Sequence, residues 1–177
     1  QSVAYGSPRE RAQHTAALVM TGKHIRHFTF GEDRITGQET LPELKEKLDK
    51  DLKLGSKIGV DTRLNFTTDK KTEFGQMTAQ AVKDGTLLKL LVEESDTWAR
   101  RPGNEGNISY SRRAADVAKI IEKYVGISPR WNELVNQEDS KYKETMDRFM
   151  GTHQTVGESF LAKVIELTKG VEERDRF

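Results

Sequence analysis

Signals that start and stop helices recur along the whole length of this sequence. Ser-Pro-Arg-Glu at 7–10 and Thr-Leu-Pro-Glu at 40–43 each combine an N-capping hydroxyl, a proline in the first turn and a glutamate three residues after the cap. The hydroxyl can accept from a backbone N–H that has no partner within the helix, and the glutamate can bond back to the cap. Glycines suited to a helix end follow apolar-periodic runs at Gly22, Gly55, Gly85, Gly126, Gly151 and Gly170. These repeated start and stop signals predict a mainly helical chain.

The spacing of apolar residues predicts the individual elements. It indicates helices at 8–21, 40–54, 110–124, 129–136, 141–150 and 155–169, and two more that carry Phe74 and Leu91. Strands are predicted at 23–30 and at 57–67, where polar and apolar residues alternate. The helix at 155–169 is expected to bury Val164 and Leu167, and 171–177 to fray. The predicted fold class is mainly α, with about eight helices and a small two- or three-stranded β-sheet, and α+β is the near alternative.

The length of the chain predicts a single compact domain, 1–177, which is large enough to bury a core. Hydrophobic residues make up 34% and charged residues 32%, so the apolar stripes are narrow and the surface is polar. The clearest interruption is Arg-Arg-Pro-Gly-Asn-Glu-Gly-Asn at 100–107. Proline and glycine in a polar run predict either a mobile loop or a subdomain break there.

Charge and cysteine content exclude several classes of protein. The formal net charge of +1 weighs against a dedicated nucleic-acid binder, since each phosphate contact needs a cation. The absence of cysteine excludes disulfide scaffolds, thiolate zinc sites and cysteine nucleophiles. No apolar run approaches the ~20 residues that span a bilayer, and no signal peptide is recognisable. We therefore expect a soluble protein, and the sequence does not determine its cellular compartment. The start at Gln1 predicts a processed chain or a fragment of a larger protein.

Acidic and histidine pairs do not predict a metal site. Two pairs of acids lie one helical turn apart, Glu43 with Glu46 and Glu93 with Asp96. Both pairs face away from the apolar stripes of their helices, so they are not placed to hold a metal ion between helices. Glu94 is the exception, because it lies next to Trp98. His24 and His27 would point to opposite faces of the predicted strand. We expect neither a metal nor a cofactor.

Arginines and lysines provide the best candidate site. Arg112, Lys119 and Lys123 fall within about 40° of one another on a helix of 3.6 residues per turn, opposite Val117 and Ile121. Guanidinium groups match phosphate or carboxylate geometry, and N–H groups at a helix start attract anions. The alternative is an ordinary solvated face in which Asp116 pairs with these arginines. The candidate binding residues are Arg100, Arg101, Arg112, Arg113, Lys119 and Lys123.

Three functions remain open at this point. The first is a non-catalytic interaction domain whose basic surface binds an acidic or phosphate-bearing partner, which would be a protein or another polyanion. The second is an enzyme domain for a phosphorylated substrate, with arginine anchors and a histidine acid or base. The third is a self-assembling, coat-like protein. No nucleophile elbow or phosphate-binding loop is present, so no catalytic residue can be assigned.

Overall fold

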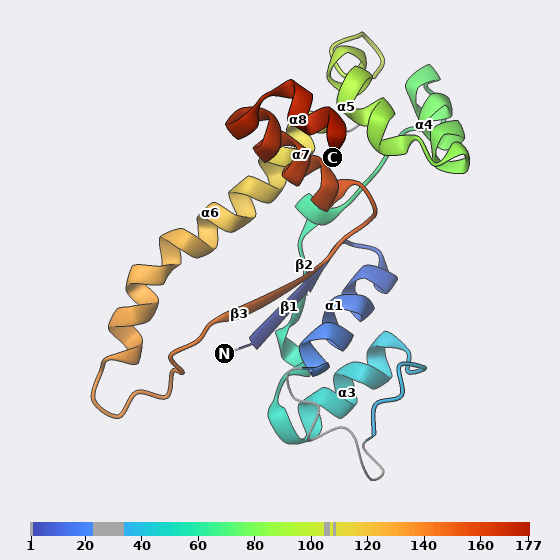
Figure 1. Ribbon diagram of the computed structural model, residues 1–177. Coiled ribbons are helices and arrows are strands. Elements are labelled where there is room, and N and C mark those ends of the chain that lie inside the picture. The colour runs from blue at the N-terminus through green and yellow to red at the C-terminus, as the bar shows by residue number, and fades with distance from the viewer. Residues whose placement is uncertain (1, 23–33, 105–106, 108) are drawn as a thin grey trace. The chain divides into compact units, whose positions relative to one another are not determined.

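The computed structural model describes residues 2–22, 34–104, 107 and 109–177 (Figure 1). Two compact units make up the chain: Gln1–Asn65 with Lys123–Thr152, and Phe66–Glu122 with His153–Phe177. Residues 100–104 lie inside the second unit, away from its borders. The described residues form seven α-helices and one small sheet, which confirms the predicted fold class.

A parallel three-stranded sheet lies at the centre of the first unit, in the order β2-β1-β3. Its strands are β1 (Ser2–Gly6), β2 (Ile58–Val60) and β3 (Asp147–Gly151). Ala4 of the central strand aligns with Ile58 on one side and with Phe149 on the other. Because all neighbours are parallel, the sheet assembles only from segments far apart in the sequence.

Helices cover both faces of this sheet. Ala4 contributes to a core formed with α1 (Glu10–Gly22) and α3 (Leu41–Leu52), where Met20 and Leu44 are fully buried. Tyr5, the next residue of β1, points to the opposite face, as strand geometry requires. Its ring lies 6.3 Å from that of Tyr124 on α6 (Tyr110–Val135).

Glycine at the ends of two strands permits close packing of α1. A Cβ at Gly151 would lie 1.9 Å from the carbonyl oxygen of Ala12, and one at Gly6 would lie 2.4 Å from the backbone of Gln13. These glycines therefore serve helix–sheet contact. The expectation that Gly151 ends a helix is wrong, because it ends β3.

The predicted start of α3 is confirmed. Thr40 N donates to Glu43 Oε2 at 2.7 Å, and Glu43 N donates to Thr40 Oγ1 at 3.5 Å, which completes a capping box. The helix ends at Lys53 and not at Gly55, since Lys53 adopts the left-handed conformation with φ of 53°. Gly55 instead packs against α3, where a Cβ would lie 2.1 Å from the carbonyl oxygen of Lys45.

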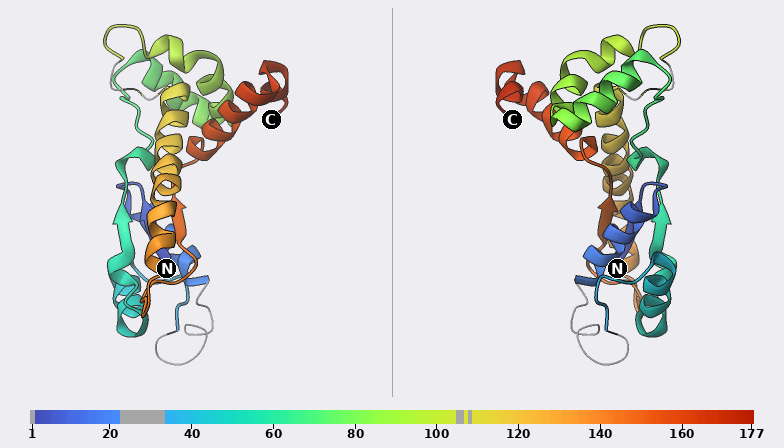
Figure 2. Two further views of the ribbon diagram at one scale, coloured as in Figure 1. Left: turned by 90° about the vertical axis from the view of Figure 1, so that its left-hand side faces the viewer. Right: turned by 90° about the vertical axis from the view of Figure 1, so that its right-hand side faces the viewer.

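The second unit is helical. A hairpin of α4 (Glu73–Asp84) and α5 (Leu87–Trp98) turns at Gly85, whose φ is 71° (Figure 2). The rings of Phe74 and Trp98 stack in its core with 5.9 Å between centroids. The first half of α6, α7 (Val156–Lys169) and α8 (Val171–Arg176) complete the unit.

Several element predictions differ from the structure. Segment 57–67 is a strand only over Ile58–Val60, after which Asp61 caps a 3-10 turn over Thr62–Leu64. The predicted strand at 23–30 lies outside the described residues. Segment 141–150 contains most of β3 where a helix was expected, and one helix, α6, replaces the two expected at 110–124 and 129–136. Residues 171–176 form α8, and Val164 and Leu167 are 40% and 76% exposed.

Candidate binding surface

The basic residues of α6 lie on one side of that helix. Arg112 and Lys119 are seven residues apart, which corresponds to about 20° around the helix, and both are exposed. The buried positions of the same segment, Tyr110, Val117 and Ile120, lie on another side. Lys123 follows on the basic side but belongs to the first unit, where its Nζ lies 5.5 Å from the ring centroid of Tyr124.

Asp116 pairs with Arg113 and not with Arg112. Arg113 is 4% exposed, and its Nη2 lies 3.6 Å from Asp116 Oδ2. Burial lowers the pKa of the Arg113 guanidinium, and the charge of Asp116 opposes that effect. Arg113 is thus part of the interior of the unit. Within the described ranges, no carboxylate forms an ion pair with Arg112 or Lys119.

The start of α6 does not offer the free N–H groups expected there. Tyr110 N donates to Ser95 Oγ at 2.7 Å, Ser111 N to Asp96 Oδ1 at 3.0 Å, and Arg112 N to Ser109 Oγ at 3.3 Å. Hydrogen bonds from Ser111 outweigh the effect of burial and lower the pKa of Asp96, which therefore caps α6 as a carboxylate. An anion at this surface would be held by side chains.

The segment after α5 carries the other two arginines. Arg100 and Arg101 are exposed, and the guanidinium carbon of Arg101 lies 3.9 Å from the ring centroid of Trp98. The Asp96–Ser111 hydrogen bonds hold the end of α5 at the start of α6. The structure therefore brings Arg100 and Arg101 to the same end of the unit as Arg112.

Asn104 and Asn107 form a hydrogen-bond network with the residues before α4, which the sequence reasoning missed. Asn107 is 2% exposed, and its Oδ1 accepts from Asp69 N at 2.8 Å. Its Nδ2 donates to Thr72 Oγ1 at 2.9 Å and to Asn104 Oδ1 at 3.2 Å. Asn107 is thus joined to the residues just before α4 by side-chain hydrogen bonds. The mobility predicted for 100–107 remains a prediction.

A second charged cluster, also missed from the sequence, lies in the first unit. Asp61 accepts a bidentate hydrogen bond from Arg63 at 2.9 and 2.6 Å, and this pair lowers the pKa of Asp61. Burial raises the pKa of Tyr124 to about 12, and the hydrogen bond with Tyr5 adds to this shift. Arg148 lies 5.2 Å from the ring centroid of Tyr124. The register of β1 and β3 pairs Arg148 with Val3, so Arg148 lies on the same face of the sheet as Tyr5.

Glu94 is the acid that the sequence placed next to an aromatic side chain. Trp98 Nε1 donates to Glu94 Oε2 at 3.2 Å, which confirms the expected proximity of these two residues. In the part of the chain that the structure describes, no three His, Asp or Glu side chains gather as metal ligands would. Nor does any helix there combine the length and apolar character needed to cross a bilayer.

Comparison with known proteins adds no relative. No protein-family model matches the sequence, and no curated protein or solved structure is significantly similar to it. The function must therefore be inferred from the surfaces themselves.

Proposed function

We propose that this chain is a non-catalytic interaction domain that binds a phosphate-bearing or acidic macromolecule through the basic face of its second unit. This basic face consists of Arg100, Arg101, Arg112 and Lys119. Lys123, the sixth basic candidate, belongs to the first unit and is left out of this face. Arg113 is buried, and we assign it a structural role.

The pairing of Asp116 with Arg113 is the observation that supports this proposal. A solvated face normally balances its arginines with acids three or four residues away. Here the acid that could balance Arg112 lies instead by the buried Arg113. Arg112 and Lys119 thus retain uncompensated charge in the region described, and exposed guanidinium groups bind phosphate or carboxylate oxygens in pairs.

Charge reversal at the basic face tests the proposal. The probes are a fluorescein-labelled peptide with several phosphoserines and a labelled single-stranded oligonucleotide, and binding is measured by fluorescence anisotropy. Arg112→Glu with Lys119→Glu is expected to weaken binding of at least one probe about tenfold or more, and parent binding should fall steeply as salt increases. The matched control is Lys71→Glu with Lys83→Glu, which makes the same charge change at exposed positions outside the face.

The two probes also distinguish the kinds of partner. Preference for the phosphopeptide supports an acidic protein partner, whereas preference for the oligonucleotide supports a nucleic acid. Equal binding by the parent, the control and the doubly reversed protein would mean that Arg112 and Lys119 are only a solvated face.

Self-assembly is a second candidate, favoured by one observation on α7. Leu161, Val164 and Leu167 recur every three residues and are 50%, 40% and 76% exposed. Exposed apolar side chains in a row are typical of contact surfaces. Sedimentation over a range of concentrations should then show oligomers that Leu167→Glu abolishes. A protein that stays monomeric throughout would exclude this candidate.

A further inference from the structure

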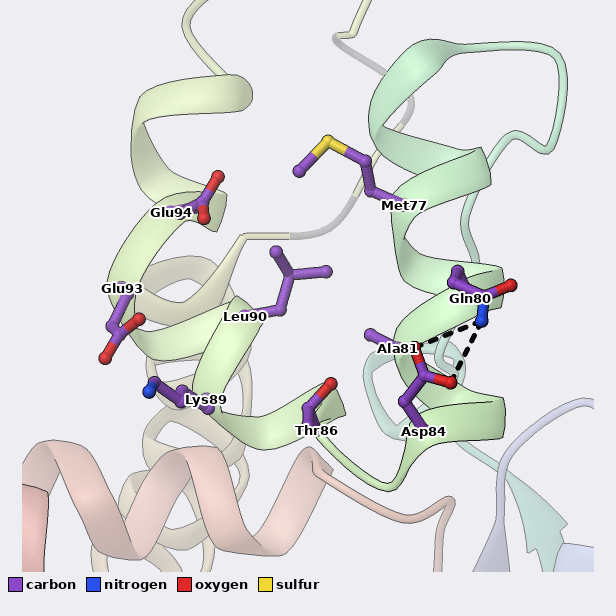
Figure 3. A pocket seen from close by; sticks show the side chains of 9 residues that line it. All are labelled: Met77, Gln80, Ala81, Asp84, Thr86, Lys89, Leu90, Glu93 and Glu94. Atoms are coloured by element: carbon purple, nitrogen blue, oxygen red, sulfur yellow. Dashed lines mark hydrogen bonds between the residues drawn. The ribbon is translucent and has the colours of Figure 1, made fainter.

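The α4–α5 hairpin contains a hollow of about 450 Å³ whose floor is apolar. Met77 and Ala81 of α4 and Leu90 of α5 form this floor. Figure 3 shows the side chains of Met77 and Leu90 pointing toward each other across the gap between the helices. Both are partly buried and pack against the core formed by Phe74 and its neighbours. The hollow is thus a seam between two helices that the second unit leaves open.

The rim of this hollow is negatively charged. Asp84 stands on the α4 side, Glu93 and Glu94 stand on the α5 side, and Lys89 is the one cation among the lining residues (Figure 3). Asp84 accepts from Gln80 Nε2 at 2.9 Å, and Glu94 accepts from the indole of Trp98. Both of these donors are neutral, so neither hydrogen bond brings a positive charge to the rim.

We propose that this groove binds an amphipathic helix of a partner protein, with Leu or Met side chains on one face and Lys or Arg on its flanks. Ridges of a third helix fit the seam between two packed helices, and apolar side chains at every third or fourth position would meet Met77 and Leu90. Methionine adapts its shape to different apolar side chains. The carboxylates of the rim select a cationic partner over an acidic one. The groove shares no residue with the basic face.

Two designed peptides test this assignment. One repeats Leu-Lys-Lys-Leu-Leu-Lys-Lys twice, and the other has every Lys replaced by Glu, so that the apolar face is kept and the charge is reversed. Each is labelled with fluorescein and titrated with the full chain. The lysine peptide is expected to bind at least about tenfold more tightly than the glutamate peptide.

Variants locate the binding site. Leu90→Glu and the pair Asp84→Lys with Glu93→Lys should each weaken the lysine peptide about tenfold. Val82→Glu is the apolar control, since Val82 is 54% exposed on α4 outside the groove, and Glu122→Lys with Glu172→Lys is the charge control. The Asp84/Glu93 pair replaces exposed side chains only, so its result stands even if Leu90→Glu impairs folding.

Methionine methyl NMR gives a direct readout of the groove. The chain has four methionines, and Met20 is fully buried in the first unit as an internal reference. The lysine peptide should shift the Met77 signal and leave Met20 unchanged. Binding that affects neither Met77 nor the groove variants would overturn the assignment. So would a Met77 signal that changes with protein concentration alone, because the groove would then be occupied by a second copy of the chain.

Discussion

Asn107 is predicted to contribute strongly to the stability of the second unit. Its amide bridges the residues before α4 and the end of the polar run, through Asp69, Thr72 and Asn104. Asn107→Ala removes all three hydrogen bonds from a side chain that is 2% exposed. The three partners are a backbone N–H, a hydroxyl and an amide, and the methyl group of alanine bonds to none of them.

The magnitude follows from the number of bonds lost. An intramolecular hydrogen bond contributes a net ~1 kcal/mol, and a buried donor left without a partner costs ~1–3 kcal/mol. Asp69 is an exposed residue, so water can satisfy part of what its N–H loses. Thr72 Oγ1 still donates to Asp69 O and accepts from Gly75 N. We therefore expect Asn107→Ala to lower the free energy of unfolding by about 2 to 3 kcal/mol.

Urea unfolding followed by tryptophan fluorescence measures this change. Trp98 reports on the second unit and Trp131 on the first, so a Trp131→Phe background isolates the unit that contains Asn107. The matched control is Gln76→Ala, which truncates an exposed amide on α4 of the same unit. Hydrogen exchange should also accelerate at Asp69, whose N–H loses its acceptor. If the unfolding midpoint and this exchange rate both match those of the control, the asparagine network does not stabilise the second unit.

Three further predictions concern stability. Thr40→Ala should cost about 1 kcal/mol by removing the cap of α3, and an unchanged urea midpoint would show that the capping box contributes nothing. Lys53→Gly should stabilise the protein by about 1 kcal/mol, because glycine adopts the left-handed backbone conformation without strain. Gly55→Ala should destabilise it by about 2 kcal/mol, because the added Cβ would clash with the backbone of α3. Thermal shifts of the same sign for both variants would refute this reasoning. Burial alone would raise the pKa of Glu166, but hydrogen bonds from Lys163 and Arg174 outweigh it and lower that pKa. Its stabilisation is present above the unfolded pKa of about 4.3 and is lost as pH falls through the folded value. Glu166→Gln should therefore destabilise at pH 7, and this effect should shrink as the pH falls below the unfolded pKa; an effect independent of pH would contradict the ionic role.

Features with a local cause were predictable from the sequence. The capping box at Thr40 involves residues three apart, and the contact between Glu94 and Trp98 joins residues four apart on one helix. β3 was missed because its pairing with β1 joins residues about 145 positions apart. The Asn107 network was missed for the same reason, since its partners precede α4. Nothing within a short window distinguishes such residues from an ordinary loop.

The continuity of α6 through Pro129 has a different explanation. Proline removes one backbone donor and crowds the carbonyl four residues earlier, which here belongs to Val125. Val125 is 67% exposed, so water can hydrate the carbonyl group there. Gly126 also lies inside the helix, and a Cβ added to it would meet no neighbouring atom within 4 Å, so it marks neither a tight contact nor an end. A helix breaker therefore fails to break a helix where the affected turn faces solvent.

The basic face shows where sequence reasoning about charge reaches its limit. Asp116 lies four residues after Arg112 and three after Arg113, and both spacings allow an ion pair on a helix. The sequence alone could not decide between them. The structure resolves the choice because Arg113 faces the interior, where an unpaired guanidinium would be costly, and Asp116 lies beside it. Burial of Arg113 thus determines which arginine Asp116 pairs with. If the proposed function holds, replacing Arg113 with Met should free Asp116 to pair with Arg112 and weaken polyanion binding. Unchanged affinity in Arg113→Met would show that Arg112 does not depend on this arrangement.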